Sequence, residues 1–416
     1  MTILRDVEVG APAHGGHCVA RVDGHVVFVR HSAPGEVVDV RVTERRRRYW
    51  RGEAIAVHRA AADRVPSIWP EAGPGGVGGG ELAHLRLPAQ RAWKTQVLHD
   101  TMRRIGGIDL ADHGLAAQRV GSIEAPGQDD GLATRTRVQL VTTEAGHAGM
   151  YRHRSHDVLA LTDLPLAALD TEELLRPGRW RKYPAGTRLT AVTPSDGPGV
   201  VLAGEEVAVG RSRYVRERVA WQGNELTFRV AASGFWQVHH RAPQALMAAV
   251  MAAAAPQAGE AILELFSGAG LFTLPLADAV GPGGAVHALE GSDQAVRDAR
   301  RNLHQQPWAR LHHGVVDPAS VAAFERADVV VLDPPRRGAG GDVMAAIAQL
   351  RPRVVVYVAC DPAALARDVR AADAHGMRLA SLEAFDLFPH THHFEAIATL
   401  VPTGVPHGLT STHKVS

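Results

Sequence analysis

Short runs of apolar residues recur through the carboxyl-terminal part of the chain and alternate with alanine-rich segments. Four of these runs occupy residues 261–266, 285–289, 328–332 and 354–358. Continuous apolar strands indicate burial on both faces, and helical segments between them indicate crossover connections. The pattern therefore predicts a parallel, doubly wound sheet, which is a Rossmann-like α/β domain, over residues 236–402.

The rest of the chain predicts further domains, because 416 residues exceed the roughly 250 to 300 that one core usually supports. Residues 1–60 indicate a small OB-like β barrel, in which an Asp23-Gly24 hairpin signal separates apolar runs and Val38–Val42 alternates in character. Residues 61–235 predict an irregular α+β module. It contains a flexible glycine-rich loop at 73–80 and a helix from about Pro88 to Gly106-Gly107. Residues 403–416 predict a tail.

The cysteine content excludes several classes of protein. Only Cys18 and Cys360 are present, so neither a disulfide framework, a four-cysteine zinc site nor a cysteine-ligated iron–sulfur cluster is possible. No apolar run approaches the roughly 20 residues of a membrane span, and the first ten residues lack an apolar signal region. We therefore expect a cytoplasmic protein without a membrane partner.

Two arginine-rich segments are candidate RNA-binding surfaces. Residues 45–51 combine five arginines with Tyr49 and Trp50 and contain no acid, a composition that suits single-stranded RNA. A solvated, charged edge strand explains the same residues equally well. Predicted strands at 134–141 and 149–154 carry arginines at alternate positions, which predicts a second basic face. The net charge is only +1, so any RNA-binding charge must be local.

A glycine-containing turn follows the first apolar strand of the α/β domain. The strand ending at Phe266 leads into Ser267-Gly268-Ala269-Gly270, and Glu290 follows Gly270 by twenty positions. Glycines there let a backbone pass close to a ligand, and the carboxylate can accept hydrogen bonds from ribose hydroxyls. The dinucleotide fingerprint needs a third glycine where this chain has Thr273, so the pattern favours S-adenosylmethionine over NAD. A tight turn with a surface glutamate is the alternative.

The third apolar strand delivers an acid and two prolines, Asp333-Pro334-Pro335, to the same sheet edge. The prolines fix an extended backbone that presents its polar groups to a planar ring. Many methyltransferases that modify nucleobases have such a segment, which does not reveal the atom that is modified.

The fourth strand ends at Cys360, a candidate nucleophile. Carbon 5 of uracil is a poor nucleophile, and addition of a thiolate at carbon 6 activates it. A base must later remove the proton from carbon 5, and Glu395 in the segment 388–395 is the predicted proton acceptor, oriented by His390 or His393. The alternatives are an inert buried cysteine and a metal site in the His/Glu segment, although methyl transfer needs no metal.

These motifs together resemble the RNA 5-methyluridine methyltransferase family over nearly the whole chain. The resembling segments are residues 234–238, 263–270, 332–336, 357–362 and 388–391, with His393 and Glu395. The resemblance implies a TRAM-type barrel, a class I methyltransferase domain, S-adenosylmethionine as cofactor and RNA as partner. It implies Cys360 as nucleophile and Glu395 as base. The implied cofactor-binding residues are Gln237, Phe266, Gly268, Gly270, Glu290 and Asp333.

The chain departs from the family pattern at two places. Many members bind an iron–sulfur cluster through cysteines, but the matching places, Val77–Gly80 and Leu164-Pro165, contain none. We therefore expect a cluster-free, metal-free monomer. Leu271 also stands where many members have asparagine.

Two other functions stay open at this point. A methyltransferase acting on an exocyclic amine would share the cofactor loop and Asp333-Pro334-Pro335 but would not need Cys360. A catalytically silent RNA-binding factor would need neither Cys360 nor Glu395. Transfer and ribosomal RNA are both possible substrates.

Overall fold

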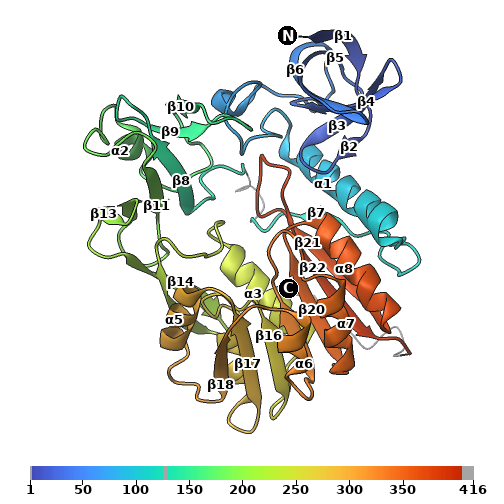
Figure 1. The fold of residues 1–416 in the computed structure, drawn as a ribbon, viewed down its shortest axis with the longest axis vertical. Helices are drawn as coiled ribbons and strands as arrows, with labels where there is room; N and C mark the ends of the chain where they lie inside the picture. The colour runs from blue at the N-terminus through green and yellow to red at the C-terminus, as the bar shows by residue number, and fades with distance from the viewer. Residues whose placement is uncertain (1, 125–129, 405–416) are drawn as a thin grey trace.

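The computed structural model describes residues 2–124 and 130–404 and contains three larger sheets and one separate hairpin (Figure 1). In the part of the chain so described, no helix is long and apolar enough to cross a membrane.

The amino-terminal region is a six-stranded, barrel-like sheet in the order β1-β5-β6-β4-β3-β2 (Figure 1). Asp23 and Gly24 join β3 to β4 with φ angles of 48° and 77°, so the predicted hairpin is confirmed with a turn of positive φ. Its strands are β1 (Ile3–Glu8), β2 (Pro12–Ala13), β3 (His17–Val22), β4 (His25–Arg30), β5 (Val37–Arg45) and β6 (Tyr49–Arg59).

The second sheet is antiparallel throughout, in the order β10-β9-β8-β11-β12-β13. Its strands are β8 (Arg137–Thr142), β9 (Ala148–Tyr151), β10 (Val158–Ala160), β11 (Arg188–Val192), β12 (Val200–Ala203) and β13 (Glu206–Val209). The short helix α2 (Thr171–Leu175) lies in the connection between β10 and β11, and β14 (Tyr214–Trp221) and β15 (Asn224–Ala231) form the separate hairpin.

Two sequence-based expectations for this region are wrong. The glycine-rich loop is packed rather than flexible: Val77 is buried, and a side chain at Gly76 would collide with the Glu71 carbonyl oxygen. The alternating arginines do not form one basic face either. Arg137 is buried and pairs with Glu217 of the separate hairpin at 3.1 Å, whereas the Arg154 side chain is 53% exposed and pairs with Glu44.

The carboxyl-terminal sheet has the order β18-β17-β16-β19-β20-β22-β21-β7. The four predicted strands are confirmed as the parallel strands β16 (Ala261–Leu265), β17 (Ala285–Glu290), β19 (Val329–Leu332) and β20 (Val354–Ala359). The sheet as a whole is mixed, because β22 (Glu395–Pro402) runs antiparallel to both of its neighbours. The remaining strands are β18 (Ala309–His313), β21 (Met377–Phe385) and β7 (Val120–Gly121).

Helices cover both faces of this sheet, as expected for a doubly wound fold. One buried apolar cluster includes side chains of α3 (Ala242–Ala254), α4 (Thr273–Val280) and α5 (Asp293–Asn302). The other includes α6 (Pro318–Ala322), α7 (Gly341–Gln349) and α8 (Pro362–Ala374). This second cluster continues through α1 (Leu87–Thr101) into the interior of the barrel, so the barrel is docked on the methyltransferase-like domain by hydrophobic packing.

The predicted helix near Pro88 is confirmed. α1 begins beside Pro88, continues as a single π turn over Met102–Gly106 and ends at Gly107, whose φ of 68° is typical of a helix terminus. The predicted division into residues 1–60, 61–235 and 236–402 stays a prediction. The predicted tail lies outside the described residues from position 405 onward.

Candidate active site

A cavity of about 610 Å³ lies at the carboxyl edge of the parallel strands. Its lining includes every predicted catalytic and cofactor-binding residue except Gly270. The predicted lining residues are Gln237, Phe266, Gly268, Glu290, Asp333, Cys360 and Glu395.

Strand direction brings Cys360 and Glu395 into the same cavity. Cys360 directly follows β20, whose last residue, Ala359, pairs with Ala396 of β22. Because β22 is antiparallel, its first residue lies at the edge where the parallel strands end. Glu395 is that first residue, so residues 35 positions apart in the sequence meet across two adjacent strands.

The turn after β16 has the backbone conformation of a ligand-binding loop. Phe266 has a φ of 60°, an unfavourable value for a phenylalanine that is common at functional sites. A side chain at Gly268 would meet no atom within 4 Å, so the absence of one leaves open space beside the loop. Gly270 instead faces Leu303 and Ala299 and does not line the cavity. Its φ of 93° shows that it serves the turn itself.

Glu290 is held by the backbone of this loop. Its Oε2 accepts a hydrogen bond from the Gly268 N–H at 2.9 Å, and its Oε1 accepts one from the Ser292 N–H at 2.6 Å. A carboxylate oxygen accepts more than one hydrogen bond, so both oxygens retain lone pairs for a ligand. The loop and the carboxylate thus fit the ribose of an adenosine-containing cofactor.

Three acidic groups lie together at the inner part of the cavity. Burial, followed by the charges of Glu395 and Asp333, raises the pKa of the Cys360 thiol to about 12. Burial raises the pKa of Asp333 to about 7, and burial and the Asp333 charge raise the pKa of Glu395 well above its ordinary value. The Arg336 guanidinium opposes these shifts at Cys360 and Glu395. A cationic ligand beside these groups would lower all three pKa values.

The histidines of the segment 388–395 have different positions. Both ring nitrogens of His390 are engaged, Nδ1 by the Gln90 amide at 3.1 Å and Nε2 by the Asp130 carbonyl at 3.0 Å. His390 therefore anchors the loop to α1 and does not orient Glu395. His393 lines the cavity, and its Nε2 lies 3.5 Å from an Arg336 nitrogen.

Two other groups in the described part of the chain have metal-ligand spacing: Glu124 with His239 and His240, and Asp6 with Asp39 and His58. In the first, Arg241 pairs with Glu124 at 3.0 Å and its backbone N–H donates to His239 Nδ1. The polar atoms of Glu124 and His239 are therefore engaged by Arg241, so this group is better described as an ion-pair network than as a metal site.

Sequence reasoning missed several residues of the cavity. Phe235, Phe388 and Arg336 all line the cavity, and the Phe235 side chain is 70% exposed. Phe235 and Arg336 lie within the recognised motifs at 234–238 and 332–336, but their spacing did not indicate which way the side chains face.

The basic segment of the barrel is exposed. Arg45–Arg48 lie on the surface, although Glu44 pairs with Arg46 at 2.5 Å. Trp50 is covered by the Arg45 guanidinium at 4.7 Å and by the His25 ring at 4.5 Å. The arginines are therefore accessible to phosphates, whereas Trp50 is already stacked.

Comparisons with known proteins agree with this architecture. Residues 4–55 match the TRAM domain family, and residues 316–401 match the tRNA (Uracil-5-)-methyltransferase family. A protein of Streptomyces avermitilis that is described as an uncharacterized RNA methyltransferase is 39% identical, and the match covers 95% of this chain and 98% of that protein. The 23S rRNA (uracil(1939)-C(5))-methyltransferase RlmD of Shewanella halifaxensis is 27% identical, covering 92% and 93%.

A solved structure shares the fold. The Pyrococcus abyssi tRNA (uracil-54, C5)-methyltransferase, in complex with S-adenosyl-L-homocysteine, aligns with a TM-score of 0.67 and 21% identity over 95% of this chain and 99% of that one. The fold and the relatives therefore define an α/β RNA methyltransferase with an amino-terminal TRAM domain. More narrowly, the chain belongs to the RNA (uracil-5-)-methyltransferase family.

Proposed function

We propose that this protein methylates carbon 5 of a uridine in RNA, with S-adenosylmethionine as donor, Cys360 as covalent nucleophile and Glu395 as proton acceptor. The observation that carries the proposal is the meeting of Cys360 and Glu395 in one cavity with Gln237, Phe266, Glu290 and Asp333. An exocyclic-amine methyltransferase would have no use for a thiol at this place.

The loop residues support binding of the donor. Glu290 would accept hydrogen bonds from the ribose, and the open space beside Gly268 would admit the ligand. S-adenosylmethionine supplies an electrophilic methyl group carried on a cationic sulfur. This positive charge would lower the raised pKa values of Asp333 and Glu395 and so favour their ionised forms, which complement such a cation.

Cys360 and Glu395 would divide the chemistry between addition and elimination. The Cys360 thiolate forms a bond to carbon 6, and the electrons of the 5,6 double bond move to the carbonyl at carbon 4 as an enolate. Carbon 5 then forms a bond to the methyl group while the bond from that methyl group to the donor's sulfur breaks, and the electron pair stays on sulfur, which leaves S-adenosylhomocysteine. Glu395 removes the remaining proton from carbon 5, the enolate reforms, and the bond from carbon 6 to sulfur breaks to release Cys360 as a thiolate.

Aromatic residues at the cavity would hold the target base. Phe235 is largely exposed, and Phe388 lines the same cavity. Base stacking on an aromatic ring contributes about 1–3 kcal/mol and does not depend strongly on sequence. We propose that these rings receive a uracil turned out of its RNA strand, a step that base-modifying enzymes require.

The product identifies the modified atom. Purified protein incubated with S-adenosylmethionine and separate transfer and ribosomal RNA fractions should produce 5-methyluridine in one fraction, detected by nucleoside mass spectrometry. RNA from a deletion strain is the sensitive substrate, because its target uridine is unmodified. Formation of a methylated guanosine or adenosine in place of 5-methyluridine would contradict the proposal.

The exposed arginines at 45–48 should bind RNA phosphates. Replacing all four by alanine should weaken RNA binding by about tenfold or more. The salt dependence should also become weaker, because each lost phosphate contact reduces the number of counterions that RNA binding releases. Cofactor affinity should be unchanged. The measurement is fluorescence anisotropy across a salt series. The control replaces four exposed arginines elsewhere, namely Arg300, Arg301, Arg367 and Arg370. Equal effects of the two sets would refute a specific role for the barrel segment.

We further propose that the protein acts in the cytoplasm as a cluster-free monomer. Val77 and Leu164, at places where the family resemblance implies cluster ligands in other members, are buried in one apolar cluster with Trp69. Apolar packing would thus stabilise the region that a metal cluster supports elsewhere.

A further inference from the structure

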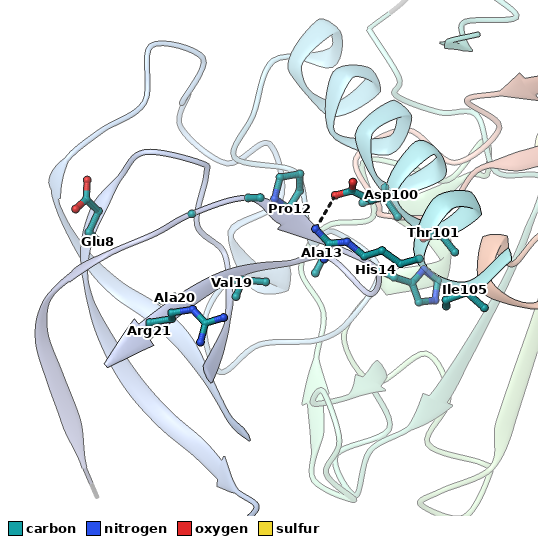
Figure 2. Close-up of a pocket in the computed structure, with 14 residues that line it drawn as sticks. Glu8, Pro12, Ala13, His14, Val19, Ala20, Arg21, Asp100, Thr101 and Ile105 are labelled. Carbon is teal, nitrogen blue, oxygen red and sulfur yellow. Dashed lines mark ion pairs between the residues drawn. The ribbon is translucent and has the colours of Figure 1, made fainter. Parts of the chain in front are cut away.

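The amino-terminal barrel contacts the catalytic edge through polar side chains as well as through its apolar core. A groove of about 640 Å³ is lined by residues of the barrel on one side and of α1 and its π turn on the other. Figure 2 shows this groove, with Pro12, Ala13 and His14 on the barrel side and Asp100 and Thr101 on the helical side. His14 extends from this region to the catalytic edge.

The first polar contact ends beside the candidate nucleophile. His14 Nε2 lies 3.1 Å from Asp361 Oδ2, and Asp361 directly follows Cys360. The other oxygen of Asp361 accepts a hydrogen bond from the Ala364 N–H at 2.8 Å, which caps the amino terminus of α8. The carboxylate is therefore held from two sides, by its own helix and by the barrel.

The second polar contact ends near the candidate base. Arg30 of β4 donates to Glu81 at 3.3 Å, and the other Glu81 oxygen lies 3.4 Å from His392 Nδ1. Arg30 and Glu81 are both buried. Burial favours the protonated form of Glu81, but His392, the Gly79 N–H and Arg30 outweigh this effect and lower its pKa.

The two contacts converge on the cavity. The His14 and His392 rings lie 6.1 Å apart in an edge-on arrangement, and the His392 and His393 rings lie 3.9 Å apart. His393 lines the cavity two positions before Glu395. The barrel thus reaches the segments that carry both candidate catalytic residues.

Hydrophobic packing already docks the barrel, because one apolar cluster runs from the barrel through α1 to α8. Docking alone does not require the contact of His14 with Asp361, the residue after Cys360. Nor does it require the buried ion pair of Arg30 and Glu81 beside the segment that carries Glu395. The location of both polar contacts suggests a further role, which is control of geometry.

We propose that His14 and Glu81 are positioning residues, through which the barrel fixes the segments of Cys360 and Glu395 in reactive geometry. This inference rests on the proposed function. It predicts that the barrel contributes to turnover separately from its contribution to RNA affinity. Addition of a thiolate to carbon 6 is sensitive to such control, because a misplacement of about 1 Å can cost about 100-fold in rate.

His14→Ala should lower kcat by about tenfold while the RNA KM stays within about twofold. The alkylation rate of Cys360 by iodoacetamide should also change, and this rate reports on Cys360 because Cys18 is fully buried in the barrel. His14→Gln retains a hydrogen-bond donor and should restore most of the activity. His58→Ala is the matched control, since it removes a histidine that pairs with Asp39 at 2.9 Å within the same barrel.

A double-mutant cycle with Asp361→Asn separates positioning from general damage. Asparagine still caps a helix, so α8 should remain intact. If His14 acts through Asp361, His14→Ala should cost little more once Asp361 is asparagine. Equal loss in both backgrounds, or unchanged kcat and alkylation in His14→Ala, would overturn the proposal. Absence of 5-methyluridine with the wild-type protein would instead refute the proposed function, and the alkylation rates would still test the contact.

Discussion

Cys360→Ala should abolish methylation, with a loss of roughly four orders of magnitude or more in turnover. The alanine variant cannot form the bond to carbon 6, so carbon 5 is never activated. Cofactor affinity should be nearly unchanged, because the loop at Gly268 and the carboxylate of Glu290 are untouched. Incorporation of labelled methyl groups into RNA measures the first effect, and calorimetric titration with S-adenosylhomocysteine measures the second.

Cys18→Ala is the matched control for this experiment. Cys18 lies buried in the barrel with its thiol 3.8 Å from the Ser32 carbonyl oxygen and is not part of the cavity lining. This variant should methylate RNA normally. Substantial turnover by Cys360→Ala would refute covalent catalysis and would favour methylation of an exocyclic amine.

Glu395→Gln should trap the enzyme on its RNA. Cys360 adds to carbon 6 and the methyl group is transferred before any proton leaves carbon 5, so loss of the base blocks only the final elimination. Glutamine keeps the size of glutamate but cannot take up the proton, which separates loss of basicity from loss of shape. Denaturing electrophoresis should show a slow band that carries the methyl label of the donor.

Two further variants define this adduct. The double variant Cys360→Ala/Glu395→Gln should give no slow band, because the nucleophile is absent. Glu383→Gln makes the same substitution at an exposed position of the neighbouring strand β21 and should turn over normally. Normal turnover by Glu395→Gln, or binding of both ligands without an adduct, would assign the proton transfer to another group.

Residues at the ends of the parallel strands could be predicted from the sequence. Phe266, Asp333 and Cys360 each follow a continuous apolar run, and all such runs end at one sheet edge. The direction of β22 could not be predicted, because an apolar run has the same pattern in either direction. Only pairing with β20 shows why Glu395, at the beginning of its strand, lies beside Cys360.

Contacts between distant segments were also beyond sequence reasoning. His390 or His393 was expected to orient the base, but the ring of His390 contacts Asp130 and Gln90, the latter three hundred positions away on α1. Arg137 was expected on a basic face, yet Glu217 pairs with it in the interior. Residue spacing describes one element at a time, whereas these outcomes depend on which elements pack together.

Peptide mapping of the Glu395→Gln adduct tests the central claim most directly. Trypsin should release residues 354–367, which lie between Arg353 and Arg367 and contain Cys360 as their only cysteine. After nuclease digestion, tandem mass spectrometry should find a methylated uridine nucleotide attached to Cys360 of this peptide. An unmodified peptide from the trapped complex, or a nucleotide attached to any other residue, would contradict the account.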